Sequence, residues 1–84
     1  MKLMKAEKAW IIRVNATLAE CPSERLGFFT TGERWISVYD RRKEQAIDAY
    51  QLRHNRDFCQ GANDCGALAQ ERLTFPANVA STCG

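Results

Sequence analysis

The residues of this chain that are best suited to chemistry are one histidine and four cysteines. His54, Cys59 and Cys65 follow one another closely, and either Cys21 or Cys83 would supply a fourth ligand. Zinc favours these ligand types in tetrahedral sites. The spacing argues against such a site, because a zinc knuckle separates its cysteines by about two to four residues. Between Cys59 and Cys65 there are five. We therefore predict no metal site and no other cofactor.

Catalysis by a nucleophile would need a cysteine or serine beside a base. The chain has a single histidine, and no catalytic signature surrounds any cysteine or Ser23, Ser37 or Ser81. A phosphate-binding loop is also missing, because Gly61 and Gly66 are not followed by Lys and Ser or Thr. A chain of this length has little volume for a substrate cleft. We expect that the protein is not an enzyme.

Length and composition predict a single globular domain over residues 1–84, with 45% hydrophobic and 26% charged residues. The net charge of +2 is too small to select a nucleic-acid partner. Charged residues recur between Met1 and Lys8, which excludes the apolar segment of a signal peptide. No apolar run is long enough to span a bilayer. We expect a cytoplasmic protein without a membrane partner, whose cysteines stay reduced and unpaired.

The hydrophobic pattern alternates in three segments, and each is predicted to be a strand. These segments are residues 9–16, 26–31 and 34–39. Gly32 lies in a turn that joins the second and third of them. After Asp40, a good helix cap, the period becomes helical until about His54, and a short second helix is expected from Asn63 or Asp64 to Arg72. The predicted fold class is α+β, with a small three-stranded antiparallel sheet, one main helix and a short second helix.

The same periodicity predicts one hydrophobic core from two strands and the main helix. Its expected members are Trp10, Ile12, Val14, Ile36, Val38, Ile47 and Tyr50. In the segment 34–39, Ile36 and Val38 share one face while Trp35 and Tyr39 share the other, so the pattern leaves open which face is buried.

The densest basic run, Arg41, Arg42 and Lys43, opens the main helix, where positive charge opposes the helix dipole. This placement favours contact with an external anion, and Trp35 and Tyr39 lie just upstream as apolar anchors. We predict these five residues as the partner-binding site.

A second interpretation of the same residues is structural. Asp40 and Glu44 would neutralise a solvated first helical turn, and the two aromatic residues would belong to the core, covered by Phe58 and Leu68.

The stretch Glu33–Tyr50, following the segment Ala9–Val14, resembles a strand-to-helix pattern found in small phage-encoded proteins, among them anti-CRISPR proteins. It is also similar to the arm-binding domains of phage integrases. The first resemblance implies a viral inhibitor that acts in the host cytoplasm by protein binding, occluding a site on a host protein or nucleoprotein complex. No functional residue carries over, because such inhibitors share no site.

Three functions therefore stand as hypotheses. The leading one is a non-enzymatic protein-binding module of the inhibitor type. The alternative is a small nucleic-acid-binding domain that uses the basic helix start, and the third is a zinc-stapled structural module. The oligomeric state is left open.

Overall fold

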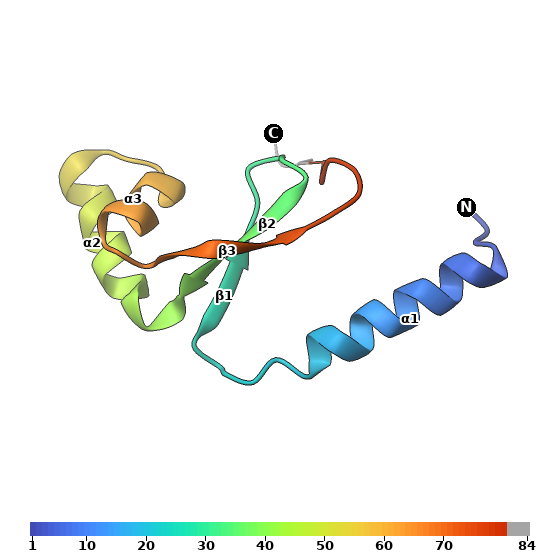
Figure 1. Ribbon diagram of the computed structural model, residues 1–84. Coiled ribbons are helices and arrows are strands. Elements are labelled where there is room, and N and C mark those ends of the chain that lie inside the picture. Colours follow the sequence, from blue (N-terminus) through green and yellow to red (C-terminus); the bar gives the residue numbers. More distant parts are fainter. Residues whose placement is uncertain (81–84) are drawn as a thin grey trace.

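The computed structural model describes residues 1–80 and has the predicted α+β class. Within these residues, three antiparallel strands form one sheet in the order β1-β2-β3. In chain order the elements are α1 (Lys5–Ala19), β1 (Leu26–Phe29), β2 (Trp35–Asp40), the 3-10 turn η1 (Arg41–Lys43), α2 (Glu44–His54), α3 (Phe58–Asp64) and β3 (Leu68–Thr74). Figure 1 shows α2 and α3 together at one end of the sheet and α1 extending beyond the other.

The first predicted strand, residues 9–16, is wrong, because this segment is the middle of helix α1. Trp10, Ile12 and Val14 do alternate, but Trp10, Val14 and Leu18 also recur at every fourth position, which is helical spacing. The alanines, lysines and glutamates around them are strong helix formers. At the helix start, the backbone N–H of Met4 donates to Glu7 Oε1 at 2.7 Å.

The predicted hairpin is confirmed by β1 and β2, which pair Phe28 with Val38 and Phe29 with Ser37. In the turn, the N–H of Gly32 donates to Thr30 Oγ1 at 3.2 Å. Gly32 has a φ of 90°, a conformation that a residue with a side chain rarely adopts.

The main helix is confirmed as well. Asp40 Oδ1 accepts a hydrogen bond from the backbone N–H of Arg42 at 3.0 Å, which caps the η1 turn that leads into α2. At the other end Asn55 is left-handed, with a φ of 53°, and its N–H donates to Gln51 O at 2.8 Å. This left-handed residue ends α2 at His54.

The short helix predicted from Asn63 or Asp64 to Arg72 is wrong. A helix does occur nearby, but α3 begins earlier, where the Asp57 side chain accepts from Gln60 N at 2.8 Å, and it ends at Asp64. The left-handed Gly66, with a φ of 70°, then turns the chain into β3. Pairing with β2, which joins Ile36 to Leu73 and Ser37 to Arg72, makes this segment a strand.

The core is small and lies where α2, α3 and the start of β3 meet. Within the described residues its buried hydrophobic side chains are Ile47, Ala62 and Ala67, and partly buried neighbours such as Tyr39, Phe58 and Leu68 pack against them. Glycine at position 61 keeps α3 close to α2, because a Cβ there would lie 3.2 Å from Ile47 Cγ2. Tyr50 links the same two helices by donating its hydroxyl to Asp64. This hydrogen bond raises the pKa of Tyr50 and lowers that of Asp64.

The predicted core is therefore right for Ile47 and wrong for the α1 residues. Trp10 and Ile12 are 46% and 68% exposed. The rings of Phe29, Tyr39 and Phe58 meet edge to face with centroids 5.0 to 5.9 Å apart, so α3 covers the Tyr39 face of β2. Ile36 and Val38 lie on the opposite face, away from the core.

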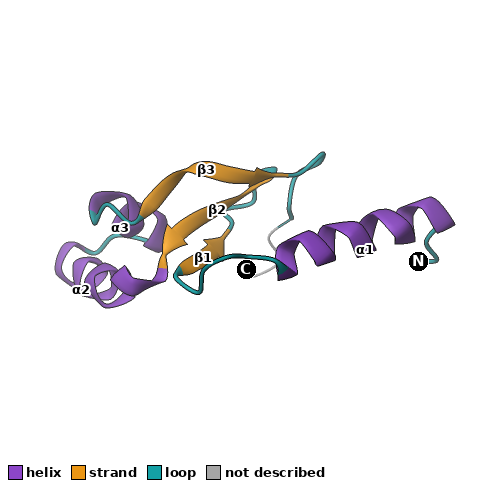
Figure 2. Ribbon diagram, turned by 60° about the horizontal axis from the view of Figure 1, so that its bottom comes forward, coloured by secondary structure: helices purple, strands orange, loops and turns teal. Residues whose placement is uncertain are grey.

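The described part of the chain is extended rather than spherical. Its radius of gyration is 15.4 Å, whereas a compact chain of this length has a value of about 12 Å. The dimensions are 50 × 31 × 18 Å, and the long axis runs from α2 to the free end of α1 (Figure 2). None of the helices within residues 1–80 is both long and apolar enough to cross a membrane.

Candidate protein-binding surfaces

The predicted basic site lies at the corner where β2 ends and η1 begins. Arg42 holds Asp40 with two side-chain hydrogen bonds, Nε to Oδ1 at 3.0 Å and Nη2 to Oδ2 at 2.9 Å. Arg25 Nη1 approaches the same carboxylate at 3.8 Å, and the Asp40 side chain is only 17% exposed. The Arg42 side-chain hydrogen bond lowers the pKa of Asp40 from 3.8 to about 2. Reciprocally, Asp40 raises the pKa of Arg42.

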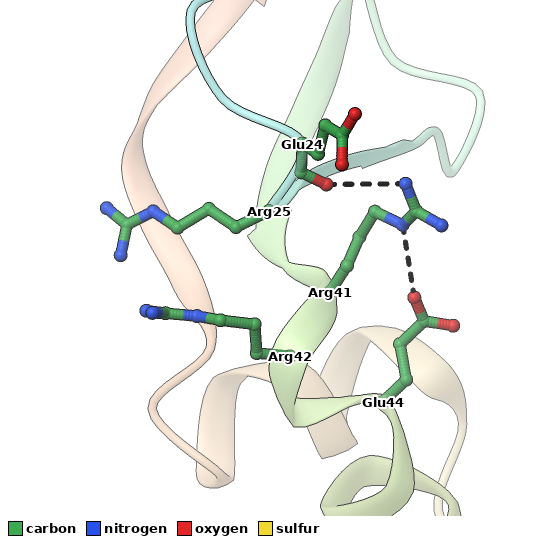
Figure 3. Close-up of a pocket in the computed structure, with 5 residues that line it drawn as sticks. All are labelled: Glu24, Arg25, Arg41, Arg42 and Glu44. Atoms are coloured by element: carbon green, nitrogen blue, oxygen red, sulfur yellow. Dashed lines mark hydrogen bonds and ion pairs between the residues drawn. The ribbon is translucent and has the colours of Figure 1, made fainter.

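Arg41 extends to the other side of this corner. Its Nε donates to Glu44 Oε1 at 3.4 Å and its Nη1 donates to the backbone oxygen of Glu24 at 3.3 Å. Figure 3 shows Arg41 with Glu24 and Glu44 on one side, and the side chains of Arg25 and Arg42 on the opposite side. These five residues line a shallow hollow of about 410 Å³. It mixes both charges, so it does not form a uniformly basic surface.

Lys43, the third basic residue, faces α3. Its Nζ lies 3.3 Å from the backbone oxygen of Cys65 and 3.4 Å from that of Gly66. These carbonyls follow the C-terminal end of α3, where a cation is favoured by the helix dipole. Arg41, Arg42 and Lys43 thus all have partners within the chain. The structural interpretation of the basic run named Asp40 and Glu44, but not the carbonyls that Lys43 contacts. An external anion would have to compete with these contacts.

The two aromatic residues of the predicted site lie in different surroundings. The Tyr39 ring covers Gly27, beside the Arg41 stem, and it packs on Phe58. Trp35 lies four positions earlier on β2, about 13 Å along the strand, and the Arg72 guanidinium lies 4.2 Å from its ring centroid. The structure therefore brings Tyr39 and Arg41 together and leaves Trp35 apart from the basic corner. Partner contact by these residues stays a prediction.

Within residues 1–80, His54 and the cysteines do not converge on one point. The His54 ring lies against Tyr50, with centroids 4.4 Å apart, and Cys65 Sγ lies 3.7 Å from the backbone oxygen of Ala46. Within the part of the chain that the structure describes, no three His, Cys, Asp or Glu side chains are placed to share a metal ion. Cys83, a possible fourth ligand in the sequence, lies outside the described residues.

Within residues 1–80, the second face of the sheet lies outside the core and is partly exposed, and the sequence pattern did not identify it as a surface. Register places Phe28 beside Val38, and Ile36 beside Leu73. We call Leu26, Phe28, Ile36, Val38 and Leu73 the open sheet face. None of these side chains belongs to the core or packs against it. Phe28 is 49% exposed and Leu73 is 37% exposed.

Helix α1 carries the second uncovered apolar surface. Trp10, Ile11, Val14 and Leu18 recur at spacings of three or four, so they share one side, which we call the apolar side of α1. No residue of α1 is buried. The helical spacing that marks this surface is present in the sequence. The predicted strand over residues 9–16 placed Trp10 and Val14 in the core instead.

Comparison with protein-family models, with curated proteins and with solved structures finds no match to this chain.

Proposed function

We propose that this protein is a binding module for other protein chains, and that it works by apolar contact rather than by catalysis. The observation that carries the proposal is the amount of surface left exposed. The accessible area is 6,947 Å², whereas a compact monomer of this mass exposes about 5,000 Å². The difference of about 1,900 Å² exceeds the roughly 800 Å² that one partner contributes to a standard interface.

The chemistry of the exposed surface supports a protein partner. Large apolar side chains lie exposed on α1 and on β1, including Trp10, Leu18 and Phe28. Monomeric proteins seldom expose contiguous apolar patches larger than a few hundred Å², and larger patches mark interaction sites. Aromatic residues such as Trp10 are also enriched among the residues that dominate interface energies.

Nucleic acid is the weaker alternative. A phosphate bound to the basic run would compete with Asp40, Glu44 and the carbonyls after α3, which the three side chains already contact. The net charge of +2 adds little general attraction for a polyanion.

As a mode of action we propose occlusion of a site on a host complex, in the manner of the small phage-encoded inhibitors that Glu33–Tyr50 resembles. This extension is supported by the sequence pattern alone. It predicts stoichiometric inhibition, in which the activity of the bound complex falls linearly and reaches its minimum at one equivalent of this protein per site.

The test is capture of protein partners by the immobilised full chain, followed by affinity measurements with each purified partner between 50 and 200 mM salt. We expect affinity to change by less than about tenfold over that range, because apolar contacts release few ions, whereas binding through six to ten phosphates would weaken by about 10³–10⁵. The matched variants are Val14→Asp on the apolar side of α1 and Ile12→Asp on its other side. Loss of binding in the first but not the second supports the proposal. If no protein binds, this chain included, the proposal is wrong.

A further inference from the structure

Helix α1 has little packing within its own chain to stabilise it. Its 15 residues are only as long as the isolated helices that are marginal in water, about 12–15 residues. Most helical stability in proteins comes from packing of an apolar face, and nothing within the described chain covers the apolar side of α1 (Figure 1). The capping contact at Met4 and Glu7 supplies one hydrogen bond at the first turn.

In the structure α1 extends away from the sheet of its own chain, after a connection of six residues that leads to β1 (Figure 1). Arg25 O accepts from Arg41 N at 2.7 Å, and Arg41 Nη1 donates to Glu24 O at 3.3 Å, so the end of the connection is attached to the corner after β2. Pro22 stiffens its start, because a proline ring fixes its own φ and restricts the residue before it.

The open sheet face is the surface in this chain that fits α1. At 15 residues the helix is about 22 Å long, and the seven residues of β3 extend about 23 Å. Both surfaces are apolar, with Phe28, Val38 and Leu73 on the sheet and Trp10 and Val14 on the helix. A helix packed on one face of a sheet is the common two-layer arrangement of α+β domains.

We propose that the chain forms a symmetric dimer in which the apolar side of α1 from each copy packs on the open sheet face of the other copy. This inference rests on the proposed protein-binding function and names the partner of its apolar surfaces. Exchange of α1 creates two identical contacts related by a twofold axis. Both apolar surfaces of both chains are then occupied, so no further copy binds. The excess area of about 1,900 Å² per chain is more than such an interface needs.

The first experiment locates the contact in the full chain without disturbing its apolar surfaces. The photoreactive residue p-benzoylphenylalanine replaces Phe28, and chains labelled with ¹⁵N are mixed with unlabelled chains before illumination. We expect cross-linked peptide pairs that join position 28 to residues of α1 and carry one isotope on each side. If every cross-link to α1 carries a single isotope and no mixed pair is found, the helix folds back within its own chain and the proposal is overturned.

The second experiment measures mass by light scattering over a range of concentrations, with three substitutions. Val14→Asp and Phe28→Asp should each raise the dimer dissociation constant by at least about 100-fold, because each places an unpaired charge in the contact. Ile12→Asp, on the other side of α1, should change it by less than about threefold. Mixing the Val14 and Phe28 variants should restore dimers in part. One of the two contacts then joins the intact helix of one chain to the intact sheet of the other, while the second contact carries both charges.

The outcomes separate this inference from the proposed function. The wild-type chain should have twice the 9.5 kDa mass of one chain. If it stays monomeric at every concentration while binding a foreign protein, the dimer is wrong and the binding function stands. If the Phe28 variant dimerises as the wild type does, α1 pairs with something other than the sheet and the exchange is wrong.

Discussion

Replacing Ile47 by alanine tests where the core lies. The side chain is fully buried, and its Cγ2 is close enough to Gly61 that a Cβ there would lie 3.2 Å away. The substitution removes three carbons, worth about 0.8 kcal/mol each in transfer free energy, and leaves a cavity between α2 and α3. We expect a loss of about 3–4 kcal/mol in the free energy of unfolding. For a chain of 84 residues the whole stability is about 4–13 kcal/mol, so this variant loses a large part of it.

The matched control is Ile12→Ala, which removes the same atoms from a side chain that is 68% exposed on α1. Its cost should stay below about 0.5 kcal/mol. Urea unfolding followed by circular dichroism, at one fixed protein concentration, measures both variants. At a slope of about 1 kcal/mol per M, the midpoint should fall by about 3 M for Ile47→Ala and should hardly move for the control. Equal shifts would refute the core described here and would restore the one predicted from alternation, in which Ile12 and Ile47 were both buried.

Three further predictions concern the corner, the sheet and the thiols. The pKa of Asp40 is lowered to about 2, so its contribution to stability is complete above its ordinary value of 3.8 and is lost as the pH falls through 2. Asp40→Asn should remove that part of the acid sensitivity, and urea midpoints that fall equally in both proteins between pH 4 and 2 would contradict it. Gly27→Ala should cost about 1–3 kcal/mol in urea unfolding, because the new Cβ would overlap the Tyr39 ring; a neutral result would place that ring elsewhere. Thermal unfolding should be unchanged by chelator and by reductant, and a collapse of the transition under either agent would show that the cysteines hold the fold.

Several elements follow from the sequence because their signals are local. Gly32 supplies the positive φ of the turn between β1 and β2, and the alternation on either side of it has no competing period. Asp40 caps the next turn by accepting from Arg42, and the helical period continues without interruption to His54. In these segments propensity, capping and turn chemistry all agree, so no tertiary contact is needed to choose between structures.

The sequence shows where the predicted site residues lie along the chain, but it does not show all of the groups within the chain that their side chains contact. Asp40 and Glu44 were expected to neutralise the basic run, and they do bind Arg42 and Arg41. The contact of Lys43 with the carbonyls after α3 joins residues more than twenty positions apart. A contact of this kind has no pattern in the sequence, because it depends on how α3 packs against α2.

Only the tertiary structure decided that residues 68–74 form a strand and which face of the sheet is covered. Trp10 to Leu18 fits both an alternating and a helical period, and because no residue of α1 is buried, the helix formers around them favour the helix without tertiary contacts. Residues 68–74 become a strand because β2 offers them a partner with free backbone groups. The face of Ile36 and Val38 is open because α3 places Phe58 on the Tyr39 side. Alternation shows which residues share each face of a strand. Which face is covered depends on helices that are distant in the sequence and pack against the sheet.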